Sequence, residues 1–97
     1  MIRHVAMFSW IPEATAEQKQ RVAAELAALA PLMRGLRGYL FGADAHLVEG
    51  NADFAVVADF EDAEAYLAYR HHPAHVEVVN RAIQPIARQR TTIQIEI

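Results

Sequence analysis

The segment Ile2-Arg3-His4-Val5-Ala6-Met7-Phe8-Ser9-Trp10-Ile11 decides the fold of this chain. Its alternate residues form two faces of a strand, and both faces are largely apolar. One face carries Ile2, Ala6, Phe8 and Trp10, and the other carries Val5, Met7 and Ile11. Strands with this pattern are covered on both sides in the folded protein. The sequence therefore predicts a strand at residues 2–11 that needs two covering layers.

Helix signals follow this strand. Thr15-Ala16-Glu17-Gln18 matches a capping box, in which the Thr15 and Gln18 side chains satisfy exposed backbone N–H groups. Apolar residues then recur at spacings of four, three and four, namely Val22, Leu26, Leu29 and Met33. This spacing predicts a helix with one buried stripe, which Pro31 kinks or ends.

Two strands are expected in the middle of the chain, at Tyr39–His46 and Asp53–Phe60. Gly42 interrupts the first strand and marks a bulge or a close backbone approach. The second strand alternates, with its larger apolar face made of Phe54, Val56, Ala58 and Phe60. The turn between the two strands is expected at residues 49–51.

Two helices and a strand complete the chain. Asp62 is a suitable cap for a short helix at residues 63–69, and Pro73 suits the first turn of another helix. That second helix is expected to bury a stripe formed by Val76, Val79, Ile83 and Ile86, and to end with Arg88 and Arg90. Thr91–Ile97 alternates without interruption, and Ile93, Ile95 and Ile97 are predicted to point inward.

The order strand, helix, strand, strand, helix pair, strand predicts an α+β fold. Two βαβ-type halves make a ferredoxin-like domain, a four-stranded antiparallel sheet with helices on one face, over residues 1–97. Helices cover only one face, so the second apolar face of residues 2–11 needs another cover. We expect the same face of a second subunit, so that a homodimer forms a dimeric α/β barrel.

Composition narrows the classes of partner. The formal net charge is −3, and the arginines are scattered, which argues against a nucleic-acid partner. The chain has no cysteine, which excludes thiolate metal sites and cysteine nucleophiles. No signal-peptide core or run of 18 apolar residues is present, so we expect a soluble, cytoplasmic protein without a membrane partner.

The candidate functional residues gather in Tyr69-Arg70-His71-His72-Pro73-Ala74-His75-Val76, which holds three of the five histidines. Pro73 separates two helices here, and titratable side chains at such a junction can line a pocket. Two other interpretations stay open. The histidines could brace the junction, or His71, His72 and His75 could bind a metal together with His4 or an aspartate.

Three segments together resemble the stress-responsive dimeric α/β-barrel (Dabb) family. They are Ile2–Phe8, Asp53–Phe60 and, above all, Tyr69-x-x-His72-Pro73-Ala74-His75-Val76. The resemblance covers nearly the whole chain and implies a homodimeric ferredoxin-like barrel. The family includes stress-induced proteins without a clear reaction, and plant polyketide cyclases of the olivetolic acid type, which close a linear chain by an aldol-type condensation.

The resemblance to those cyclases implies a site. His75 matches the catalytic base, Tyr69 matches the tyrosine that assists it, and His4 matches a histidine of the pocket wall. With His72, Phe8 and Tyr66 as further pocket residues, the expected chemistry is proton abstraction beside a carbonyl, without a cofactor or metal. Arg70 and His71 replace apolar residues of the cyclase, so a different substrate is expected. A non-catalytic, ligand-binding or stress-responsive barrel is the alternative function.

Overall fold

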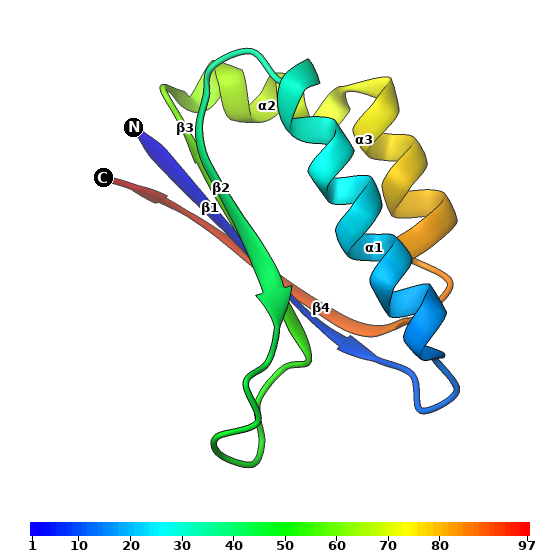
Figure 1. Ribbon diagram of the computed structural model, residues 1–97. Coiled ribbons are helices and arrows are strands. Elements are labelled where there is room, and N and C mark those ends of the chain that lie inside the picture. Colours follow the sequence, from blue (N-terminus) through cyan, green and yellow to red (C-terminus); the bar gives the residue numbers. More distant parts are fainter.

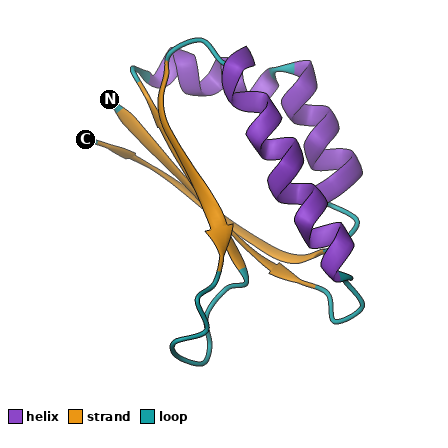
Figure 2. Ribbon diagram, in the orientation of Figure 1, coloured by secondary structure: helices purple, strands orange, loops and turns teal.

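The computed structural model describes residues 1–97 as a four-stranded sheet with a layer of helices on one face (Figures 1 and 2). The strands lie in the order β2-β3-β1-β4, and all neighbouring strands are antiparallel. The elements in chain order are β1 (Ile2–Trp10), α1 (Ala16–Leu29), η1 (Ala30–Leu32), β2 (Leu36–Ala43), β3 (Phe54–Phe60), α2 (Ala63–His71), α3 (Pro73–Val78), η2 (Val79–Ile83) and β4 (Ala87–Glu96). The α+β architecture predicted from the sequence is confirmed.

The core lies between the helices and one face of the sheet. The larger apolar face predicted for β3 is buried there, with Phe60 and Ala58 fully enclosed. Ala6, Phe8 and Trp10 of β1 are buried beside it, and Ile2 is partly buried. The predicted stripe packs against them: Val22, Leu26 and Leu29 of α1 are buried, and so is Met33, which follows η1 because the regular helix ends at Leu29. We call this side of the sheet the covered face.

The helix starts were predicted correctly. The Thr15 hydroxyl accepts a hydrogen bond from the Gln18 backbone N–H, and the Gln18 side chain accepts one from the Thr15 N–H, which completes the capping box. The Asp62 carboxylate accepts a hydrogen bond from the Ala65 N–H at the start of α2.

None of the helices is long and apolar enough to span a bilayer.

The strand β2 differs from its prediction. It covers Leu36–Ala43 instead of Tyr39–His46. Its register shift lies between Leu36 and Gly38, and a Cβ at Gly42 would meet no atom within 4 Å, so the bulge or close backbone approach predicted at Gly42 is wrong. The end of the strand has a local cause. The Asp44 side chain accepts a hydrogen bond from the backbone N–H of His46, which has a positive φ of 58°. Asp side chains that bond the backbone in this way favour turns over strands.

The apolar stripe after Pro73 also differs. Val76 is exposed, whereas Val78, Ala82, Ile83 and Ile86 are buried. A π-helical turn, η2, continues α3, and its wider turns rotate the buried side relative to a regular helix. A stripe counted at a helical spacing of three and four therefore placed Val76 wrongly.

The largest correction concerns β4. It begins at Ala87, so Arg88 and Arg90 lie in the strand and do not end a helix. Its isoleucines were predicted to point inward, but Ile93 pairs with Val5, on the face away from the helices. Gln94 pairs with His4 and therefore faces the helices. The alternation was recognised correctly, but the face of a strand depends on its register with the neighbouring strand.

The face of the sheet away from the helices is apolar and uncovered, and we call it the open face. One row of paired residues crosses all four strands, made of Leu40, Val57, Val5 and Ile93. Leu40 is 71% exposed and Ile93 is 55% exposed. An exposed apolar patch of this kind is typical of a protein interface.

Candidate functional site

The junction between α2 and α3 has the predicted break before Pro73, although α2 continues to His71, beyond the predicted end at residue 69. His72 has an extended backbone (φ −60°, ψ 130°), which suits a residue that precedes proline. Its Nδ1 accepts a hydrogen bond of 3.1 Å from the Ala74 backbone N–H. His72 therefore caps α3, and one of its ring nitrogens is occupied by that structural bond.

His75 lies in the first turns of α3 with its ring held on two sides. The ring centroids of His75 and Tyr69 are 4.2 Å apart. His75 Nδ1 lies 3.3 Å from the carbonyl oxygen of Arg70, where an Nδ1–H can donate a hydrogen bond. In this tautomer Nε2 carries a free lone pair, and no side chain or backbone group of the protein bonds to it.

Tyr69 forms the wall behind His75. Its side chain is buried, and its ring also contacts that of Phe60, with centroids 5.0 Å apart. The Tyr69 hydroxyl lies 3.3 Å from the Tyr39 hydroxyl, so its hydrogen bond goes to β2 and not to His75. Burial raises the pKa of Tyr69 well above its ordinary value, and the hydroxyl therefore stays protonated.

His4 lies deeper, on the covered face of β1. It is 4% exposed, and its Nδ1 accepts a 3.0 Å hydrogen bond from Gln94 Nε2. Its ring centroid is 4.9 Å from that of Tyr66 and 6.1 Å from that of Tyr69. Burial lowers the pKa of His4 to about 4, and the positive charge of Arg90 contributes. His4 is therefore a neutral hydrogen-bonding residue at physiological pH.

The predicted site residues do not all meet. His4, Tyr66, Tyr69 and His75 form a connected group of rings. Phe8 is instead stacked on Trp10, at a centroid distance of 5.7 Å, and belongs to an aromatic group with Phe54. His72 stands beside the group as the cap of α3.

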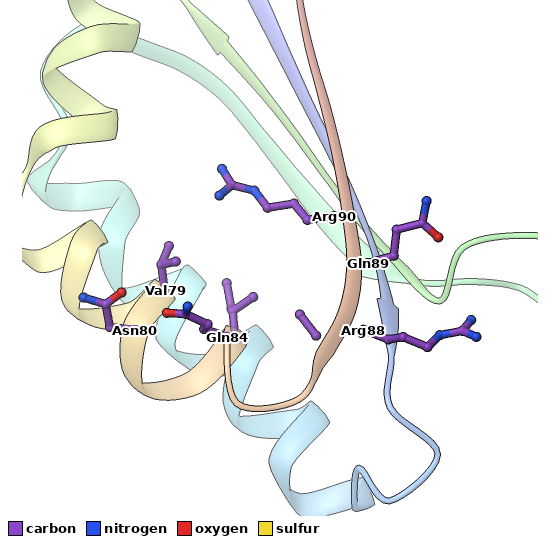
Figure 3. Close-up of a pocket in the computed structure, with 8 residues that line it drawn as sticks. Val79, Asn80, Gln84, Arg88, Gln89 and Arg90 are labelled. Carbon is purple, nitrogen blue, oxygen red and sulfur yellow. The ribbon is translucent and has the colours of Figure 1, made fainter.

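A groove runs along the outer side of α3 and β4, next to His75. A cavity of about 240 Å³ is lined by Arg70, His71, His75, Val76, Val79, Asn80 and Arg90. A second cavity of about 450 Å³ adjoins it and shares Val79, Asn80 and Arg90 with it (Figure 3). We call the two cavities together the β4 groove. His75 is the only member of the ring group that lines it.

Arg90 and Gln94 are site residues that the sequence reasoning missed. Arg90 pairs with Phe8 and Gln94 with His4, so both lie on the covered face of β4. The sequence of β4 shows that its polar residues and its isoleucines lie on opposite faces. Which of these faces meets the helices is decided only by the register of β4 against β1.

The charges of the groove act on His75. Burial lowers the pKa of His75 below its ordinary value, and the hydrogen bond to the Arg70 carbonyl opposes this effect. The positive charges of Arg90 and Arg70 lower the pKa further. The imidazole is consequently neutral near pH 7 and able to accept a proton.

The metal interpretation finds no support in the arrangement of side chains. No group of three or more histidine, aspartate or glutamate side chains is placed to hold a metal ion. His72 directs its Nδ1 at the Ala74 N–H, whereas His75 directs its Nδ1 at the Arg70 carbonyl. The Nδ1 atoms of His72 and His75 therefore do not point to a common ligand.

Comparison with known proteins places this geometry in a family. The model of the stress responsive A/B barrel domain (Dabb) matches residues 2–97. A dimeric ferredoxin-like protein of unknown function from Thermobifida fusca is 38% identical, with a TM-score of 0.92 over 99% of this chain and 90% of that one. A search of curated proteins found no match.

Two more distant structures share the fold. A Dabb family protein from Mesorhizobium loti is 21% identical, with a TM-score of 0.81 over 99% of this chain and 95% of that one. The hydroxynitrile lyase from Passiflora edulis is 14% identical, with a TM-score of 0.86 over 99% of this chain and 92% of that one. Because the family model matches nearly the whole sequence, this chain belongs to the stress-responsive A/B barrel (Dabb) domain family.

Proposed function

We propose that this protein is a cofactor-independent enzyme of the cyclase or lyase type, in which His75 is the general base. The observation that carries the proposal is the setting of the His75 ring. It packs on Tyr69, its Nδ1 is bonded to the Arg70 carbonyl, and it lines a cavity of about 240 Å³ with Nε2 free of protein partners. A base needs this combination of fixed orientation and access.

The proposed reaction begins with proton transfer to Nε2 of His75 from a carbon beside a carbonyl group. In a cyclase the enolate carbon then attacks a second carbonyl carbon, which closes a ring, and the alkoxide that forms takes the proton from Nε2 of His75. In a lyase the electron pair of the enolate instead expels a leaving group from the neighbouring carbon, and that group takes the proton. A β-keto or polyketide-like compound supplies both groups. Tyr69 assists as a positioning residue, because its buried ring holds the imidazole at the edge of the groove.

We further propose that the enzyme works as a homodimer. The row made of Leu40, Val57, Val5 and Ile93 is apolar, with Leu40 and Ile93 exposed and the two valines partly exposed, and a second copy of the same face would cover it. The relative from Thermobifida fusca is described as dimeric. Contact between two open faces leaves His4 on the covered face and His75 on α3 at the opposite side of each sheet from the contact.

The test is turnover by the His75→Ala variant. A panel of β-keto and polyketide-like compounds would first be screened by mass spectrometry for cyclised or cleaved products. General base catalysis typically contributes about 10²–10⁴-fold, so His75→Ala should lose at least about a hundredfold in kcat. In the wild type, kcat should fall as pH drops below the lowered pKa of His75, because the protonated ring cannot accept a proton.

His46→Ala is the matched control, because His46 is an exposed histidine in the loop between β2 and β3. Circular dichroism would show that both variants keep the fold. Unchanged turnover in folded His75→Ala would refute the proposal.

A second candidate function is a non-catalytic barrel that binds a ligand and in which the histidines are structural. His72 favours it, since its ring serves as the cap of α3. This function predicts a lower melting temperature for His75→Ala and no turnover of any compound by the wild type. The two candidates therefore differ in the wild-type screen itself.

A further inference from the structure

The two arginines of the cavity that contains His75 lack acidic partners, as do Arg34 and Arg88. The chain has a net charge of −3, and four of its eight arginines are paired with carboxylates: Arg3, Arg21, Arg37 and Arg81. Arg70 and Arg90 form no ion pair. Both line the cavity that contains His75, one from the end of α2 and the other from β4.

No carboxylate lines either cavity of the groove. Apart from the arginines, Gln89 and His75, the polar lining of the groove is His71 and the side-chain amides of Asn80 and Gln84. In Figure 3 the Arg90 side chain extends from β4 towards the helices, whereas those of Arg88 and Gln89 extend to the other side of the strand. The groove beside His75 therefore presents cations and amides without an acid to neutralise them.

We propose that Arg70 and Arg90 bind the anionic group of the substrate, a carboxylate or phosphate, and so place its carbonyl-bearing carbons against His75. This inference rests on the proposed function and adds the substrate class. A guanidinium binds either anion through paired N–H···O hydrogen bonds, which fix orientation as well as position. The larger cavity, which continues from Arg90 along η2 and β4, gives room for the remainder of the molecule.

Binding of the anion also changes the base. The cations of the groove lower the pKa of His75 in the free protein. A bound carboxylate or phosphate offsets their field, which raises the pKa and strengthens the imidazole as a proton acceptor. An uncharged analogue of the substrate lacks this effect as well as the direct contact.

The experiment measures binding without requiring turnover. Calorimetric or NMR titration would use three probes: 4-oxopentanoate, its methyl ester and inorganic phosphate. The first two share a ketone, and the ester replaces the carboxylate by an uncharged group with one added methyl; phosphate tests the other source of an anion. We expect at least one anion to bind and the ester to bind more weakly, on the order of tenfold, since hydrogen bonds to charged groups are stronger than neutral ones. Whichever of the two anions binds more tightly shows whether the site takes a carboxylate or a phosphate.

Arg90→Gln and Arg70→Gln should each weaken anion binding, on the order of tenfold, and leave ester binding unchanged. Arg34→Gln is the charge-matched control, because Arg34 is exposed and lies between η1 and β2, outside the groove. If a groove variant does not fold, anion binding by the wild type is measured at increasing salt concentrations instead. Binding should weaken as ionic strength rises. Equal binding of ester and anion, or equal affinities in Arg34→Gln and Arg90→Gln, would overturn the inference.

The result is separable from the fate of the proposed function. His75→Ala should keep most of its anion affinity, because the arginines make the contact. Anion binding that depends on Arg90, in a protein without turnover, would support the anion site and reject catalysis. Turnover that depends on His75 but not on either arginine would support catalysis and reject the anion site.

Discussion

The two faces of this sheet are both rich in apolar side chains, yet they are built for different partners. The covered face combines its core with a polar edge, where His4 is bonded to Gln94 and Arg90 reaches the groove. The open face carries an apolar row across four strands. Two residues along β1 and β3 from Val5 and Val57, Arg3 and Asp59 form an ion pair, with 2.7 Å between Arg3 Nε and Asp59 Oδ1. A titratable group can be buried only where hydrogen bonds accompany it. On the covered face Gln94 of β4 supplies one to His4, and Tyr39 of β2 supplies one to Tyr69, so the candidate site lies there.

The role of the open face as the dimer contact is tested most strongly by a charge placed in that face. Val5→Asp introduces a carboxylate between Val57 and Ile93. In a homodimer that carboxylate would be buried without a partner, at a cost of about 3–5 kcal/mol. We expect the dimer to dissociate at micromolar concentration, as measured by light scattering.

Ala27→Asp, at an exposed position of α1, is the control and should keep the wild-type mass. A wild-type mass near the 10.8 kDa of one subunit would reject the dimer itself. A dimeric Val5→Asp variant would show that another surface makes the contact.

The covered face can be tested through the pH dependence of stability. The pKa of His4 is lowered from 6.5 to about 4, so the unfolded chain binds a proton between these values and the native chain does not. Stability from this residue is fully present above pH 6.5 and is lost as pH falls towards 4. The loss amounts to about 3 kcal/mol, from roughly 1.4 kcal/mol for each pH unit.

The measurement is denaturant unfolding of the wild type and His4→Gln between pH 4 and 7. Glutamine does not titrate, and its carbonyl can replace Nδ1 as the acceptor for Gln94. The variant should therefore show a shallower decline of the free energy of unfolding as pH falls. Identical slopes would mean that His4 is protonated in the native state, and that its neutral bond to Gln94 does not persist.

Much of the fold could be predicted from the sequence, because local signals agreed with the final packing. The Thr15–Gln18 capping box, the stripe from Val22 to Met33 and the break at Pro73 each depend on residues close together in the chain. The face of β4 could not be predicted from its own residues. Its isoleucines and Gln94 alternate, and only the pairing with His4 decides which set meets the helices.

The candidate site divides in the same way. The nearness of Tyr69 to His75 follows from the helix junction and was expected. Arg90 comes from a strand remote in sequence, so its approach to His75 depends on tertiary structure alone. The deviation of α3 into a π-helical turn, which exposes Val76, likewise had no signal in the spacing of apolar residues.

The smallest effect is expected from His72, whose role as a helix cap differs from the proposed general-base role of His75 three residues later. His72→Ala removes the acceptor for the Ala74 N–H and should lower the free energy of unfolding by about 1 kcal/mol, as loss of a helix cap does. His72→Asp supplies another capping oxygen and should restore most of that loss. Thermal or denaturant unfolding measures both, and turnover should stay close to wild type in His72→Asp, in contrast to His75→Ala. A folded His72→Asp variant as inactive as His75→Ala would show that His72 takes part in the reaction. The assignment of His72 as a helix cap only and of His75 as the general base would then be wrong.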